Sequence, residues 1–265
     1  MAGKFSNPLP SHQNPPHLEN LQLEILYQDE FFVAINKPAG MLVHRTNIAF
    51  EENVLIAERL LKEQIGQKVF PLHRIDRPTS GILVFGLSSE AASLVQPLFP
   101  TEEVKKYYLT IVRGYMTENH GIIEKPLKKK LYGDLQESKS EYWSLSQNEI
   151  PIASTDRYPS SRYSLLKVYP HTGRMHQIRR HLAHDRHYVI GDSTHGDNRQ
   201  NHFFKAQFGM ENLLLHAWQF EFVHPFTQES IKLEANLPDY FIDICKKLGL
   251  SVPLNENPIR FVQLP

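Results

Sequence analysis

The stretch Leu72-His73-Arg74-Ile75-Asp76-Arg77-Pro78-Thr79-Ser80-Gly81 places one carboxylate between two arginines, directly before an apolar run at residues 82–85. The run predicts a buried strand, so Asp76 should lie where a strand enters the core. Neighbouring positive charge favours the ionised form of a partly buried carboxylate. Such a group suits nucleophile or base chemistry. Taken alone, however, a loop aspartate in a surface salt bridge is the commoner case.

Short apolar runs bounded by turn residues dominate the rest of the chain. Strands outnumber helices, and several neighbouring strands are joined by short turns. This pattern indicates an α+β (mixed α/β) fold with a largely antiparallel central sheet flanked by helices. Gly66 is expected to end the first helix and Ser88 to begin the second. Strands are predicted at residues 23–27, 31–36, 82–87, 107–112, 164–169, 213–223 and 231–235, and helices at 54–65, 88–99, 174–184 and 240–248.

Composition divides the chain into a tail and one folded unit. Residues 1–20 are rich in proline and polar residues and lack the apolar segment of a signal peptide, so we expect a disordered tail. Residues 21–265 should form one domain. Within it, three consecutive lysines and the polar stretch at 133–149 indicate that residues 116–163 are a variable, mobile insertion near the surface.

The overall charge balance argues against a uniformly basic protein that coats nucleic acid. The 265 residues carry 29 Lys+Arg and 29 Asp+Glu, so any site for a polyanion must come from local charge segregation. The single cysteine, Cys245, is set among apolar residues and is predicted to fill the core of a helix, which fits the reducing cytoplasm. No apolar run approaches the about 18 residues of a membrane span.

Positive charge gathers in one segment, residues 171–187, where Asp185 is the single acid. On a helix its members would form a basic face that is rich in hydrogen-bond donors, which suits phosphate groups. A solvated charged face is the ordinary alternative. Two of the histidines lie one turn apart, but no acidic residue completes a metal-ligand spacing, so no metal is expected. The basic residues are Arg174, Arg179, Arg180, Arg186, His171, His176, His181, His184 and His187.

Two tyrosines, Tyr107 and Tyr108, head the strand predicted at residues 107–112. The ordinary interpretation is that one packs inside the sheet while the other faces outward. The functional interpretation is that an aromatic ring stacks on a base. The sequence contains no loop typical of nucleotide triphosphate or dinucleotide binding and no serine-hydrolase elbow, so no cofactor is expected.

These motifs and their order resemble the RluA-type pseudouridine synthases. The family pattern His-Arg-Leu-Asp followed by Thr-Ser-Gly is met at residues 73–81, with Ile75 as an apolar departure, and Tyr108 lies six residues before Gly114 as in the family. Residues 172–181 read Thr-Gly-Arg-Met-His-Gln-Ile-Arg-Arg-His, which matches a third family motif. The resemblance covers roughly residues 22–236. Shorter matches occur at residues 36–40, 190–192, 214–217 and 224–225.

The resemblance implies the pseudouridine synthase fold with a catalytic cleft, residues 21–265 as the catalytic domain, and no S4-type RNA-binding domain. It implies that the N1–C1′ bond of a uridine is broken and the base is rejoined through C5, without a cofactor. Asp76 would be the essential carboxylate, acting either as nucleophile or as base at C2′. Arg179 would be its ion-pair partner, and Tyr108 would stack on the flipped uracil and assist proton removal at C5. The RNA-binding residues that it implies are His73, Arg74, Arg174, His176, Arg180 and Leu215.

Four further stretches resemble the subgroup that modifies uridine 65 of tRNA, namely residues 77–81, 87–91, 157–159 and 195–201. A cytoplasmic enzyme with tRNA as its partner is therefore expected, and a monomer is favoured. Three alternatives stay open. They are a synthase of the same family that acts on ribosomal RNA, a non-catalytic RNA-binding module, and an N-glycosidase that uses Asp76 with water as acceptor.

Overall fold

The computed structural model describes residues 21–45, 54–99, 101, 103–129 and 133–253, so the tail predicted at residues 1–20 lies outside the described residues. The strands are β1 (Glu24–Gln28), β2 (Phe32–Lys37), β3 (Phe70–Pro71), β4 (Ser80–Gly86), β5 (Val104–Arg113), β6 (His120–Glu124), β7 (Leu127–Lys128), β8 (Leu135–Gln136), β9 (Lys139–Ile150), β10 (Ser161–Pro170), β11 (Leu215–Val223) and β12 (Ser230–Glu234). The helices are α1 (Ala57–Ile65), α2 (Ser89–Val95), the 3-10 helix η1 (Gln96–Leu98), α3 (Gln177–His184), α4 (Asn198–Phe208) and α5 (Asp239–Leu248).

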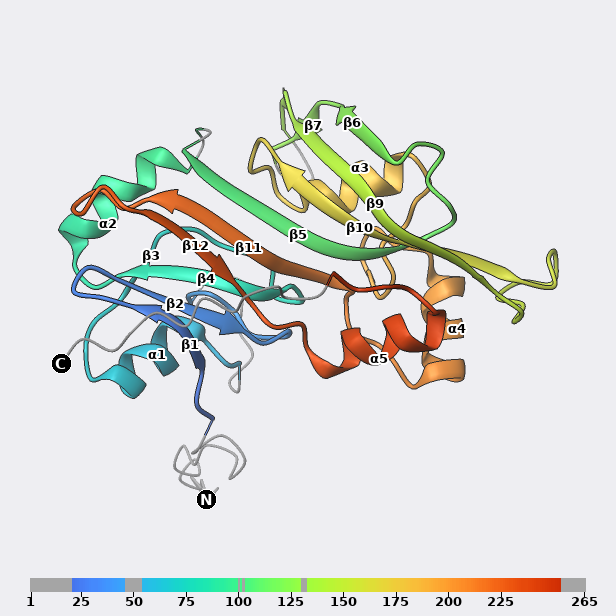
Figure 1. Cartoon of the computed structure of the whole chain (residues 1–265), viewed down its shortest axis with the longest axis horizontal. Helices are drawn as coiled ribbons and strands as arrows, with labels where there is room; N and C mark the ends of the chain where they lie inside the picture. Colours follow the sequence, from blue (N-terminus) through green and yellow to red (C-terminus); the bar gives the residue numbers. More distant parts are fainter. Residues whose placement is uncertain (1–20, 46–53, 100, 102, 130–132, 254–265) are drawn as a thin grey trace, which may run out of the picture.

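One large sheet runs through the molecule, as Figure 1 shows. Within the described residues it has ten strands, in the order β1-β2-β4-β11-β5-β10-β9-β6, with β12 paired to β11 and β3 paired to β4. Its strand pairs are antiparallel except β4 and β11, which are parallel where His216 lies opposite Ser80 and Ala217 opposite Gly81. The predicted α+β fold with a largely antiparallel sheet flanked by helices is confirmed.

Helices cover both faces of this sheet because side chains alternate along each strand. In β4, Leu83 and Phe85 pack with α1, whereas Ile82 and Val84 pack with α2 on the other face. Helix α3 covers the part of β5 and β10 that faces the same way as α1, and α4 and α5 cover the opposite face. Tyr108 of β5 contacts the apolar clusters of both α1 and α3, so it lies where the two halves of that face meet.

The capping signals in the sequence are present in the structure. Gly66 adopts a left-handed backbone with φ of 67° and ends α1, as a residue without Cβ does most easily. The Ser88 side chain accepts a hydrogen bond of 3.0 Å from the Ala91 N–H and begins α2. Cys245 is buried in α5, as predicted. None of the helices formed by the described residues has both the length and the apolar composition needed to cross a membrane.

Residues 116–163 differ from the prediction, because much of this supposed insertion is sheet. Strand β9 pairs with β10 along its length, from Ile150 opposite Ser161 to Ser140 opposite Pro170. Strand β9 could not be predicted from the sequence, because polar and half-buried residues occupy both of its faces and apolar residues do not alternate along it. That the segment is variable stays a prediction.

Two helices also differ from the prediction. The helix expected at residues 174–184 begins at Gln177, because His176 has a left-handed backbone with φ of 52°. Arg174 and His176 therefore lie in the preceding turn, and the expected single basic helix face is not formed. Helix α4 was not predicted because its surface is polar, although Asp197 accepts from the Arg199 N–H at its start and Gly209 ends it.

Candidate active site

Asp76 lies in the loop that leads from β3 into β4. The loop is closed by a hydrogen bond of 3.0 Å from the Thr79 N–H to the Asp76 carbonyl. The Asp76 carboxylate is 22% exposed and accepts a hydrogen bond of 2.9 Å from Arg179 Nη1. The fold thus brings together the two residues that the family resemblance pairs, although 103 positions separate them in the sequence.

Arg179 is the buried anchor of this carboxylate. It is 2% exposed, and its Nε and Nη2 atoms both donate to Asp192 at 2.7 Å, which leaves Nη1 for Asp76. Burial acts to lower the pKa of Arg179, but hydrogen bonds and the negative charges of Asp192 and Asp76 raise it above its ordinary value. The guanidinium therefore stays charged and holds Asp76 in one orientation.

Asp192 belongs to this site through its bonds to Arg179, although the sequence alone assigned it no role. It is 1% exposed and accepts hydrogen bonds of 2.9 Å from the Thr194 and His195 N–H groups as well as the fork from Arg179. Burial acts to raise the pKa of Asp192, but these hydrogen bonds and the Arg179 charge lower it below its usual range. The sequence did point to Asp192, because residues 190–192 (Ile-Gly-Asp) match the family. The resemblance implies no function for this short match.

Tyr108 occupies the middle of β5, opposite Ala217 of β11 and Val168 of β10. Burial, and after it the negative charge of Asp76, raises the pKa of Tyr108 above its ordinary value. The phenol is therefore protonated at neutral pH and is available as a hydrogen-bond donor or as a ring surface.

Gly81 lets the Asp76 loop approach β11 closely. It has φ of +109°, and a Cβ atom at this position would lie 2.2 Å from the Ala217 carbonyl oxygen. No other residue fits here without moving one of the two strands. Gly81 therefore sets the distance between the Asp76 loop and the strand that faces Tyr108.

A histidine pair flanks Asp76 on the side of α3. His176 Nε2 lies 3.9 Å from Asp76 Oδ1, and His176 Nδ1 lies 2.8 Å from His195 Nε2. Burial lowers the pKa of both histidines. The rings are therefore neutral at pH 7, and one N–H is shared between them. Within the described residues, no group of three or more His, Cys, Asp or Glu side chains is arranged to hold a metal ion.

Lys37 fastens the loop at residues 37–41 to the Asp76 loop. Its side chain is fully buried, and its ammonium donates to the carbonyls of Pro38 at 2.8 Å, Met41 at 3.0 Å and Arg77 at 3.2 Å. Burial lowers the pKa of Lys37 to about 7, while the charge of Asp76 acts in the opposite direction. Arg77 joins the same two loops, since its Nε donates to the Gly40 carbonyl at 3.0 Å.

The other implied RNA-binding residues come from the Asp76 loop, from the start of β11, from α3 and from the turn before it, and one of them is an exception. Arg74 is exposed and makes no hydrogen bond or ion pair within the described residues, and Leu215 is buried in the apolar cluster of α3. Arg174 and Arg180 are held by backbone carbonyls, of Glu137 at 3.2 Å and of Lys128 at 3.0 Å respectively.

The exception is His73, which the structure does not bring to the site. Its ring packs between Phe99 and Phe220, with centroid distances of 5.1 and 5.4 Å, and its Nε2 accepts from the Val84 N–H at 3.2 Å. Burial lowers the pKa of His73 to about 3. Its neighbours belong to the cluster of α2, on the sheet face opposite α3. Within the motif at residues 73–81, His73 therefore packs against the core of the fold.

Comparison with known proteins agrees with this geometry. Residues 31–184 match the family described as RNA pseudouridylate synthase. The chain belongs to this family, so it is a pseudouridine synthase, an isomerase.

Its relatives include tRNA pseudouridine synthase C from Vibrio parahaemolyticus, which is 47% identical over 229 residues that cover 83% of this chain and 92% of the relative. The same-named protein from Vibrio cholerae is 44% identical over 237 residues, or 86% of this chain and 96% of the relative.

Two solved structures share the fold. Human RNA Pseudouridylate Synthase Domain Containing 4 is 26% identical with a TM-score of 0.67 and covers 87% of this chain and 95% of its own. Human RNA Pseudouridylate Synthase Domain Containing 1 has a TM-score of 0.64 at 22% identity and covers 85% of this chain and 87% of its own. The pseudouridine synthase fold expected from the motifs is thereby confirmed.

Proposed function

We propose that this enzyme converts a uridine of tRNA to pseudouridine, with uridine 65 as the target. The observation that carries the proposal is the Asp76 carboxylate, held at 2.9 Å by an arginine that is itself anchored on Asp192. The relatives named tRNA pseudouridine synthase C support tRNA as the substrate. We further propose that the enzyme acts as a monomer in the cytoplasm.

Asp76 begins the reaction as an ionised carboxylate. It either attacks the uridine covalently or removes the C2′ proton, and in both routes the N1–C1′ bond breaks. The detached uracil stays bound and turns, and C5 joins C1′. In the covalent route the bond between Asp76 and the uridine breaks again at this point, and in the other route the C2′ proton returns from Asp76 to C2′. The C5 proton then leaves and N1 takes up a proton, so no atom is gained or lost overall. Both routes need a carboxylate of fixed orientation, which Arg179 supplies. Tyr108 stacks on the uracil, and its neutral phenol relays the C5 proton by giving up its own O–H proton as the oxygen accepts the proton from C5.

The target base must leave its helical stack before this chemistry, at a cost of about a few kcal/mol. Arg74 is exposed in the Asp76 loop and is proposed to occupy the vacated space. Arg174, His176 and Arg180 are proposed to bind the flanking phosphates, and Leu215 to form the apolar wall below the ring. Phosphate contacts of this kind position the RNA rather than read its sequence.

The test is to map pseudouridine after incubating purified enzyme with unmodified tRNA and ribosomal RNA transcripts. We expect one modified tRNA position with the parent and none with Asp76→Asn, whose thermal unfolding and RNA affinity should stay close to the parent. Loss of pseudouridine from ribosomal RNA, and not from tRNA, in a deletion strain would establish the ribosomal alternative. Release of free uracil would establish the glycosidase alternative.

A further inference from the structure

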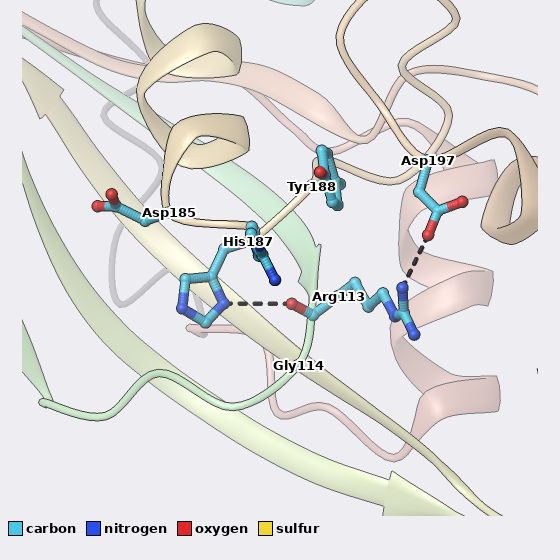
Figure 2. Close-up of a pocket in the computed structure, with 7 residues that line it drawn as sticks. Arg113, Gly114, Asp185, His187, Tyr188 and Asp197 are labelled. Atoms are coloured by element: carbon cyan, nitrogen blue, oxygen red, sulfur yellow. Dashed lines mark hydrogen bonds and ion pairs between the residues drawn. The ribbon is translucent and has the colours of Figure 1, made fainter. Parts of the chain in front are cut away.

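Two adjoining hollows lie at the end of β5 away from Tyr108. The larger, of about 530 Å³, is lined by Arg113, Gly114, residues 185–188 and Asp197, as Figure 2 shows. The smaller, of about 320 Å³, shares Arg113 and Gly114 and is otherwise lined by Gln200 and by residues between 154 and 163. At about 3.3 Å per residue, Arg113 lies about 17 Å along β5 from Tyr108. The hollows are therefore separate from the site around Asp76.

Guanidinium groups in the larger hollow retain unused hydrogen-bond donors. Arg113 is 35% exposed and gives one hydrogen bond of 2.7 Å to Asp197, and its remaining N–H groups make none within the described residues. Arg186 is exposed and its side chain has no hydrogen bond or ion pair within the same part of the chain. Besides Asp197, the larger hollow is lined by one more acidic residue, Asp185. Its charge is compensated by Lys125 at 3.6 Å, and it lies apart from Arg113 in Figure 2.

Arg186 occupies a backbone position that normally belongs to glycine. It has φ of 62°, its N–H bonds to the Ala183 carbonyl at 3.0 Å, and the His187 N–H bonds to the Leu182 carbonyl at 2.9 Å. This pair of hydrogen bonds ends a helix with a left-handed residue, where a side chain is strained. Strained residues gather at ligand sites, so an arginine here points to a use for its side chain.

Two stretches that the catalytic chemistry leaves without a role meet at these hollows. Tyr158, from residues 157–159, lines the smaller hollow and is 54% exposed, with the Arg157 guanidinium 5.3 Å from its ring centre. Asp197 and Gln200, from residues 195–201, line the larger and the smaller hollow respectively. Both stretches belong to the sequence features that resemble the tRNA-modifying subgroup.

We propose that the two hollows form a second RNA-binding site, which binds the sugar-phosphate backbone of the substrate away from the target uridine. Arg113 and Arg186 bind phosphate oxygens, for which guanidinium groups have the right geometry. Tyr158, backed by Arg157, packs against a neighbouring sugar or base. The inference rests on the proposed function, since it takes the same RNA as substrate. A second contact at a fixed spacing from Asp76 lets the enzyme select a uridine by its position in the folded RNA.

The decisive variant is Arg186→Gly, because glycine suits the backbone at this position. Affinity for a tRNA transcript is measured in an Asp76→Asn background, so that the RNA is bound without being converted. We expect the Kd to rise about fivefold and the slope of log Kd against log salt concentration to fall by about one. The thermal unfolding midpoint should stay the same or rise. Weaker binding by a protein that is no less stable separates a ligand contact from a structural one.

Arg59→Gln is the matched control, because Arg59 is exposed on α1 and pairs only with Glu63 within the described residues. An unchanged Kd and salt slope in Arg186→Gly, or an equal loss of affinity in Arg59→Gln, overturns the second site. Pseudouridine formation by the enzyme with Asp76 intact tests the proposed function separately. If Arg186→Gly weakens RNA binding but the parent enzyme, with Asp76 intact, modifies no tRNA, the RNA-binding site stands and the proposed function fails.

Discussion

Arg179 binds two aspartates at once, Asp192 through a fork of two 2.7 Å hydrogen bonds and Asp76 through a single bond of 2.9 Å. The fully buried contact with Asp192 is the stronger one and fixes the guanidinium. The weaker contact joins the guanidinium to the carboxylate of Asp76, which is open to solvent. The orientation of Asp76, the proposed catalytic group, is therefore set by a buried arginine.

Asp192→Asn should impair both stability and turnover. The substitution removes the charge that compensates a buried arginine, and breaking such a pair costs about 3–5 kcal/mol. A guanidinium free to shift also misplaces Asp76, so we expect kcat to fall about a hundredfold. Urea unfolding and single-turnover kinetics measure the two effects. Asp197→Asn, which loses a more exposed arginine contact, is the control; equal kcat losses in both variants would contradict the positioning role.

Tyr108→Phe keeps the ring and removes the hydroxyl. If the phenol carries the C5 proton, kcat should fall about a hundredfold while RNA affinity is retained. Quenched-flow measurement of pseudouridine formation, together with a binding titration, checks both parts. A rate equal to that of the parent would mean that Tyr108 serves only as a stacking surface.

His195 should position His176 through their shared hydrogen bond. With His176 Nε2–H directed at Asp76, its Nδ1 accepts from His195 Nε2–H, which fixes the tautomer. His195→Leu removes this donor and should lower kcat about tenfold with little change in KM, whereas His195→Gln can still donate and should recover most of the loss. Equal rates for the leucine and glutamine variants would show that the pair has no such effect.

His73 should contribute to acid denaturation. Burial lowers its pKa from 6.5 to about 3, so between these values the unfolded chain binds one proton more than the folded chain. The free energy of unfolding should therefore fall as pH drops from 6.5 toward 3, by up to about 4 kcal/mol from this residue.

His73→Gln keeps an acceptor for the Val84 N–H but does not titrate, so its unfolding free energy should depend less on pH in that range. Urea titrations at several pH values measure the difference. His120→Gln, at an exposed histidine, provides the comparison, and an equally flattened profile there would contradict the role of burial.

The residues proposed for catalysis could be found from the sequence more easily than the structure around them. The apolar run after Asp76 and the spacing of the motifs predict β4 and the loop before it. The contact between Asp76 and Arg179 could not come from periodicity, because it joins residues 103 positions apart; it came from the family resemblance.

The missed features share a physical cause, which is that tertiary contacts decided the local structure. Strand β9 has polar residues on both faces and is held by its pairing with β10. The late start of α3 depends on the left-handed His176, whose ring is held against His195. His73 is polar by type, yet it is enclosed by two phenylalanines that are distant in the sequence.

The segment at residues 192–197 carries an aspartate at each end, one bonded to Arg179 and the other to Arg113. Its length therefore fixes the spacing between the site around Asp76 and the end of β5. Insertion or deletion of one residue here would displace both arginine contacts together, whereas a substitution at an exposed position such as Ser193 would disturb neither. In a library of variants, exposed Ser193 should therefore tolerate changes of residue type, whereas the segment should tolerate no change in the number of its residues.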